Sequence, residues 1–135
     1  MSSTETQNRP PGGSLAADVS RHVVRLFSEY TGRGPTKART TIRGDLIVCV
    51  TQDTMTKAER RLVAEGEAEL VDTIRRKFQT TMRDDLVAGI ELMTGRKVLS
   101  FMSDHDAEQD YAAEVFVLDG LPSSPRDEGD GPIAA

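Results

Sequence analysis

The stretch from Thr56 to Gly95 constrains the fold most, because it carries helical spacing along nearly its whole length. Thr56 and Glu59 match a capping box, in which the threonine hydroxyl accepts a hydrogen bond from the N3 backbone N–H and the glutamate accepts one from the N-cap N–H. Gly95 is the residue type that commonly ends a helix in the left-handed conformation. An apolar stripe with a four-residue spacing lies between them: Leu70, Ile74, Phe78, Met82, Leu86 and Ile90. We therefore predict one long helix over residues 56–95, in which Gly66 favours a bend.

The apolar stripe predicts that this helix has more than one packing partner. Because an α-helix has 3.6 residues per turn, a four-residue spacing drifts by roughly 40° per step, or about 200° from Leu70 to Ile90. A single flat sheet does not cover that arc. We expect the far end of the helix to pack against another element, which is either the N-terminal helix or a second copy of the chain.

The rest of the pattern predicts two β-hairpins, each preceded by a helix. Residues 15–31 have apolar side chains at helical spacing, and Gly32 and Pro35 end that helix. Strands are predicted at 37–42, 46–50, 97–103 and 111–118. The order α-β-β-α-β-β indicates an α+β fold with a four-stranded antiparallel or mixed sheet. A short N-terminal helix and the long central helix would pack on one face of that sheet.

Two of the predicted strands are apolar on both faces. Residues 46–50 form the longest apolar run, and the strand over 111–118 ends in a second run of four apolar residues. Such strands are expected at the centre of a sheet that is covered on both sides. The helices cover one side only, so the other side is a candidate for self-association. We therefore predict a homodimer.

Composition indicates one domain over residues 14–119 between two disordered polar tails, 1–13 and 120–135. The net charge of −5 is unevenly distributed, with six bases and one acid from Arg21 to Arg43 and nine acids and one base from Asp104 onward. No segment approaches the roughly 18 apolar residues of a membrane span. We expect a cytoplasmic protein without direct membrane insertion.

No catalytic constellation is recognisable in the sequence. The only cysteine, Cys49, excludes an internal disulfide and a cysteine-cluster metal site. Nucleotide-binding motifs and zinc spacings are missing. An enzyme that uses His105 with Asp104 and Asp106 is an alternative, but such polar segments are usually hairpin loops. We predict a protein without catalytic residues, cofactor or metal, and the negative charge and scarce aromatic residues argue against nucleic acid.

The segment from Gly32 to Arg39 is the candidate binding site. As a structural element, it is a helix stop followed by the start of a strand. As a functional element, it is an anion or partner site, because glycine leaves backbone N–H groups accessible and Arg33, Lys37 and Arg39 add positive charge beside Gly34. Both interpretations stay open at this point.

Three segments together resemble a known family. They are the block 31–36 with its basic strand, the strand 45–50 that leads into residues 55–59, and the helix end with its exit at 92–98. In this order and spacing they resemble the small bacterial family named after the MpsC component of the sodium-translocating membrane-potential-generating system, also called YbcI-like. The resemblance covers residues 15–119 and provides no established catalytic residues.

The resemblance implies an accessory protein of the cytoplasm. Some relatives are encoded with membrane subunits of cation-transport or inorganic-carbon systems, whereas many relatives are encoded alone. The leading hypothesis is therefore a non-enzymatic, homodimeric accessory or regulatory protein linked to such a system, located in the cytoplasm or peripheral to the inner face of the membrane. The alternative is a stand-alone anion- or ligand-binding regulatory module that uses the loop 32–39.

Overall fold

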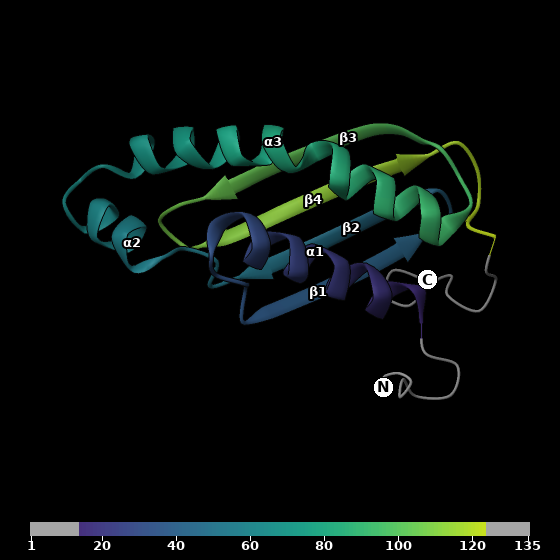
Figure 1. The fold of residues 1–135 in the computed structure, drawn as a ribbon, viewed down its shortest axis with the longest axis horizontal. Coiled ribbons are helices and arrows are strands. Elements are labelled where there is room, and N and C mark those ends of the chain that lie inside the picture. Colours follow the sequence, from purple (N-terminus) through teal and green to yellow (C-terminus); the bar gives the residue numbers. More distant parts are fainter. Residues whose placement is uncertain (1–13, 124–135) are drawn as a thin grey trace.

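The computed structural model describes residues 14–123 and contains three helices and one four-stranded sheet (Figure 1). The predicted tail at 1–13 and residues 124–135 of the predicted tail at 120–135 lie outside the described residues. The helices are α1 (Leu15–Thr31), α2 (Lys57–Ala64) and α3 (Ala68–Thr94), and the strands are β1 (Lys37–Arg43), β2 (Leu46–Gln52), β3 (Val98–Asp106) and β4 (Tyr111–Leu118).

The sheet has the order β1-β2-β4-β3, and all three neighbouring pairs are antiparallel. The two hairpins therefore meet through β2 and β4, the strands predicted to be central. α1 and α3 lie across the same face of the sheet (Figure 1). The α+β class, the four strands and the one-sided placement of the helices are confirmed, and the sheet is antiparallel.

The prediction of one long helix over 56–95 is wrong in one respect, because α2 and α3 are separate helices. Gly66 has φ 87°, and the N–H groups of Gly66 and Glu67 bond back to the carbonyl oxygens of Val63 (3.0 Å) and Leu62 (2.8 Å). This pair of bonds is the Schellman motif, which ends a helix rather than bending it. The glycine that was expected to weaken the helix thus provides its stop signal.

Both ends of the predicted helix are confirmed. Thr56 caps α2 through its hydroxyl, which accepts from Glu59 N at 3.2 Å, and the Glu59 carboxylate accepts from Thr56 N at 2.8 Å. Gly95 ends α3 with φ 70°.

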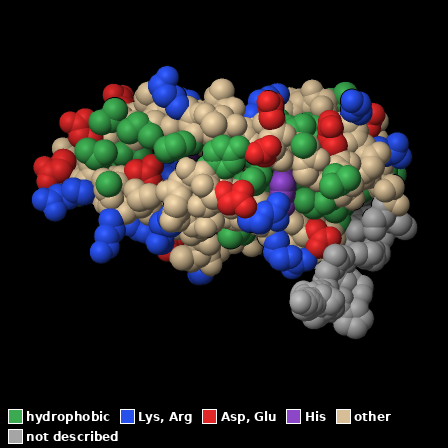
Figure 2. All heavy atoms as spheres, viewed as in Figure 1, with side chains coloured by type: hydrophobic (Ala, Val, Ile, Leu, Met, Phe, Trp, Pro, Cys, Tyr) green, Lys and Arg blue, Asp and Glu red, His purple; other side chains and the backbone are tan. Residues whose placement is uncertain are grey.

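The apolar stripe of α3 leaves the sheet as its drift predicts. Met82, Leu86 and Ile90 are fully buried against α1 and the sheet, whereas Leu70 is 44% exposed at the other end. Of the two partners expected for the far end, the structure provides α1. Over the first half of α3 the residues that face inward are Val71, Arg75 and Gln79 instead. Figure 2 shows hydrophobic side chains among charged ones over α2 and this first half of α3.

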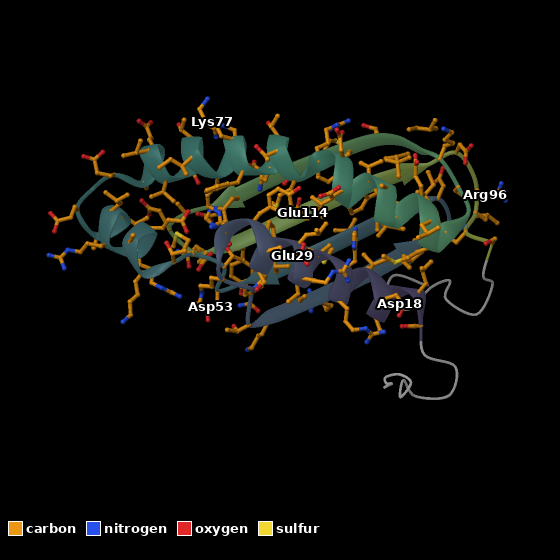
Figure 3. The ribbon with its side chains drawn as sticks, viewed as in Figure 1. Asp18, Glu29, Asp53, Lys77, Arg96 and Glu114 are labelled. Atoms are coloured by element: carbon orange, nitrogen blue, oxygen red, sulfur yellow. The ribbon has the colours of Figure 1, made fainter. Side chains whose placement is uncertain are left out.

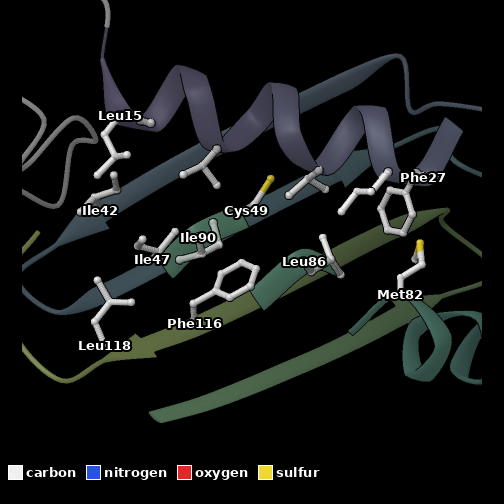
Figure 4. Close-up of a cluster of buried hydrophobic side chains, with 14 residues drawn as sticks. Leu15, Phe27, Ile42, Ile47, Cys49, Met82, Leu86, Ile90, Phe116 and Leu118 are labelled. Atoms are coloured by element: carbon white, nitrogen blue, oxygen red, sulfur yellow. The ribbon is translucent and has the colours of Figure 1, made fainter. Parts of the chain in front are cut away.

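The core between the helices and the sheet is aliphatic with two phenylalanines (Figure 4). α1 and α3 approach closely at Gly89, where an added Cβ would lie 2.2 Å from two atoms of the His22 ring. That ring is buried, and its Nε2 lies 3.2 Å from the carbonyl oxygen of Leu86. Gly89 is therefore the position that allows α1 to pack on α3.

Candidate functional site

The face of the sheet opposite the helices is a candidate interaction surface, and we call it the open face. The helix-side residues of β1 are fixed by contacts such as Ser20 Oγ with Thr40 Oγ1 at 2.8 Å, so Lys37, Arg39 and Thr41 lie on the open face. The strand register places the residues of the open face in four rows across the sheet. The centre of this face is built from the residues that the sequence marked as apolar on both sides: Val48, Val50, Ala113, Val115 and Val117.

Two of the rows carry opposite charges at their two ends. In the first row Lys37 pairs with Gln52, which pairs with Tyr111, which pairs with Asp106. The Gln52 amide donates to the Tyr111 hydroxyl at 2.9 Å, which confirms that these side chains share a face. The second row follows the same order: Arg39, Val50, Ala113 and Asp104. The open face is therefore basic along β1, apolar in the middle and acidic along the end of β3.

The other two rows are mainly apolar. The third contains Thr41, Val48, Val115 and Met102, and the fourth contains Arg43, Leu46, Val117 and Ser100. Met102 is 51% exposed, and Leu46 and Tyr111 are also exposed. Apolar side chains in contact with water make this face a candidate contact surface.

The predicted anion loop is divided by the structure. Arg33 turns to Asp53, with 2.9 Å between Nη2 and Oδ1, and Arg60 pairs with the same carboxylate at 2.5 Å. Hydrogen bonds from Arg60 and Thr36 lower the pKa of Asp53 to about 2, so this carboxylate is charged at neutral pH. Gly34 packs beside Val24 of α1.

Lys37 and Arg39 lie on the open face. Lys37 borders a hollow of about 280 Å³ that also contains Asp53, Arg60 and Asp110. The four residues chosen from the sequence therefore do not form one binding site, and Arg33 is already paired with the Asp53 carboxylate.

His105 is held by residues other than the two acids beside it. Its Nε2 lies 3.1 Å from Asp110 Oδ1 and its Nδ1 lies 3.4 Å from Asp72 Oδ1. The side chains of Asp104 and Asp106 accept instead from backbone N–H groups of the β3–β4 hairpin. The expected grouping of His105 with Asp104 and Asp106 therefore does not form.

Asp110 ties the hairpin to the β2–α2 connection. Its carboxylate accepts from Thr54 Oγ1 at 2.9 Å and from Met55 N at 3.1 Å. Burial alone raises the pKa of Asp110, but the hydrogen bonds from Met55, His105 and Thr54 outweigh it and lower that pKa. The network explains why His105 is buried, and it fixes the loop in place.

The sequence interpretation missed a buried polar cluster below α3. Glu114 on β4 is 0% exposed, and Figure 3 shows it on the sheet beneath the helices. Arg75 is 3% exposed and donates to Glu59 Oε1 at 3.0 Å, and Gln79 is buried one turn further on. Strand alternation could have found Glu114, because it stands two residues before Phe116 and four before Leu118 on the same face.

Burial raises the pKa of Glu114 to about 8, although Ser103 and the charge of Arg75 act to lower it. Ser103 stands opposite Glu114 in the strand register and is close enough to lower its pKa, but neither carboxylate oxygen nor Ser103 Oγ has a partner of normal hydrogen-bond geometry among the described residues. At pH 7 the Glu114 carboxyl is therefore mostly protonated and neutral.

The fold is that of a small α+β domain whose four-stranded sheet has its helices on one face and leaves the other face open. No described helix combines the length and hydrophobicity needed to cross a bilayer. The MpsC family, described as "Na+-translocating membrane potential-generating system (MpsC)", matches residues 12–120, and the chain belongs to this family.

A distant relative is also found. The chain is 27% identical over 107 residues to the "Uncharacterized protein YbcI" of Bacillus subtilis (strain 168), which covers 78% of this chain and 86% of that protein. No solved structure matches this chain.

Proposed function

We propose that the protein is a non-enzymatic accessory or regulatory component of a cation-translocating membrane system and that it works as a homodimer. Its place is the cytoplasm or the inner surface of the membrane. Family membership supports the link to the membrane system, because the family is described by a sodium-translocating, potential-generating system. The open face, with its apolar centre and charged margins, is the observation that carries the homodimer.

The two charged rows of the open face are complementary to themselves. A two-fold axis parallel to the strands, placed between two stacked sheets, exchanges left and right but keeps each row at its level. Arg39 of one copy then faces Asp104 of the other, and Lys37 faces Asp106. The apolar side chains of β2 and β4 meet at the centre of the contact. Such an isologous contact uses the same patch on both copies, and stacked sheets pack in this way about 10 Å apart.

A charge exchange on the open face tests this arrangement. We expect Arg39→Asp to weaken the dimer by at least about tenfold in Kd, because it sets acid against acid at two symmetric positions. Asp104→Arg is expected to weaken the dimer to the same extent, because it sets base against base at the same two positions. The double variant Arg39→Asp/Asp104→Arg restores the pairing and the dimer. Sedimentation equilibrium at several concentrations measures all four proteins.

Lys77→Asp is the matched control, because Lys77 is exposed on α3 and points away from the sheet (Figure 3). It should leave the dimer unchanged. A wild-type protein of single-chain mass at high concentration would contradict the homodimer. A double variant as weak as the single ones would contradict this geometry.

The membrane link has its own test. Affinity purification of the tagged chain from native membranes, compared with an untagged strain, is expected to recover an integral subunit of a cation-translocating or inorganic-carbon system. Recovery of the chain without any such subunit would count against the proposal. The dimer test is independent of this result.

The alternative function, an anion-binding module at the loop 32–39, has less support from the contacts there. Asp53 neutralises much of the charge of Arg33 and Arg60, and Lys37 borders the hollow beside two carboxylates.

A further inference from the structure

A hollow of about 210 Å³ lies between α3 and β3, on the helix side of the sheet. α3 contributes Arg76, Gln79, Thr80 and Arg83, and β3 contributes Phe101 and Ser103. None of these residues belongs to the open face or to the loop 32–39. The hollow is therefore separate from both surfaces discussed above.

Two polar groups that line this hollow make no hydrogen bond of normal geometry, although Ser103 lies close enough to the Glu114 carboxyl to lower the pKa of that acid. Gln79 Nε2 and Ser103 Oγ are buried and have no hydrogen-bond partner among the described residues. Arg75 Nε, on the same side of α3 as Gln79, is also buried without one, while its Nη1 is occupied by Glu59. A buried polar group without a partner costs about 1–3 kcal/mol, so these groups indicate something that would bind them.

The rim of the hollow is positively charged. Within residues 14–123, no carboxylate oxygen lies within 4 Å of the guanidinium nitrogens of Arg76 or Arg83. Their hydrogen bonds are long, 3.4 Å from Arg76 to Thr73 Oγ1 and 3.4 Å from Arg83 to the carbonyl oxygen of Phe101. The Arg83 guanidinium also lies 5.3 Å from the centre of the Phe101 ring, which holds it at the rim.

No carboxylate lines the hollow. The acid behind it is Glu114, which stands opposite Ser103 in the strand register. Because burial raises the pKa of Glu114 to about 8, this carboxyl is mostly neutral at pH 7 and repels an anion little.

We infer that this hollow binds a small oxyanion, either a carboxylate or a phosphate, between the guanidinium groups of Arg76 and Arg83 and the Gln79 and Ser103 side chains. Planar guanidinium groups suit both kinds of anion, since each offers two oxygens to one fork of donors. The volume corresponds to roughly seven waters at about 30 Å³ each. It holds a small anion with a few waters but lies below the roughly 300 Å³ at which pockets for larger ligands begin.

Calorimetric titration at pH 7 and constant ionic strength tests the inference, with inorganic phosphate and acetate as separate probes against a sodium chloride background. We expect saturable binding of one anion per chain for at least one probe. Arg76→Gln and Arg83→Gln each remove a charge and should raise the Kd at least about tenfold. Binding of phosphate alone would identify a phosphate site, and binding of acetate alone a carboxylate site.

Lys77→Gln is the matched control, because it removes one positive charge from the same helix outside the hollow. It should leave the Kd within about twofold. Circular dichroism confirms that each variant is folded. Absence of saturable binding by both probes, or equal weakening by Lys77→Gln and Arg83→Gln, would overturn the inference.

Discussion

Glu114→Gln is expected to stabilise the protein at pH 8 and to flatten the dependence of its stability on pH. The Glu114 side chain is fully buried on β4 and faces Arg75 of α3, Ser103 of β3 and Cys49 of β2. Burial disfavours the charged form, and it raises the pKa from the ordinary 4.5 to about 8. Glutamine has nearly the same shape and no proton to lose.

The direction of the pH effect follows from proton counting. Between pH 4.5 and 8 the folded chain keeps the Glu114 proton, whereas the unfolded chain has lost it. The stability contributed by the protonated acid is fully present below pH 4.5, falls as the pH rises through this window, and is lost above pH 8. The whole fall is on the order of 5 kcal/mol for this one group.

Urea unfolding of both proteins from pH 5 to pH 9 measures the effect. The wild type should lose stability steadily over this range, and Glu114→Gln should lose much less. Glu108→Gln, in the exposed β3–β4 turn, is the control and should follow the wild type. Parallel curves for Glu114→Gln and the wild type would show that Glu114 is ionised in the folded protein.

Gly89→Ala is expected to destabilise the protein by about 1–3 kcal/mol, although alanine favours helices. The added methyl group would lie 2.2 Å from Cε1 and Nε2 of His22. The ring is buried and close to the Leu86 carbonyl oxygen, so moving it into the hollow that it borders would break this contact. Either the ring is displaced or α1 shifts off α3, and overpacking of this kind typically costs about 1–3 kcal/mol.

A double-mutant cycle separates the clash from every other effect of the methyl group. In a His22→Ala background the ring is gone, so Gly89→Ala should instead stabilise by up to about 1 kcal/mol through helix propensity. Denaturant unfolding of the four proteins gives the coupling free energy between positions 22 and 89. The same sign of effect in both backgrounds would refute the contact between α1 and α3 at this position.

Local sequence signals account for most of the fold. The capping box at Thr56, the glycine stop at Gly95 and the alternation in the strands are each read within a few residues, and all of them are confirmed. The division of the central helix was visible only as a weak position at Gly66. Whether the helix continued or ended at Gly66 depended on how the residues after 67 pack over the sheet. The spacing of the apolar stripe does not show this packing.

The candidate site was less predictable. Arg33, Lys37 and Arg39 are close in sequence, but Arg33 pairs with the Asp53 carboxylate, whereas Lys37 and Arg39 lie on the open face. The complementary charged rows of the open face can be recognised only when the register of all four strands is known. The hollow beside Gln79 and Ser103 can be recognised only when the position of α3 on β3 is known.

The sequence by itself determined the order of the strands, the class of the fold and the presence of a second apolar sheet face, because caps, helical spacing and strand alternation act between near neighbours in the chain. Only the tertiary structure decided the neutral state of Glu114, the pairing of Arg33 with Asp53 and the fit of His22 against Gly89. Each of these depends on distance and burial between residues remote in sequence, and electrostatic and packing energies follow distance in space.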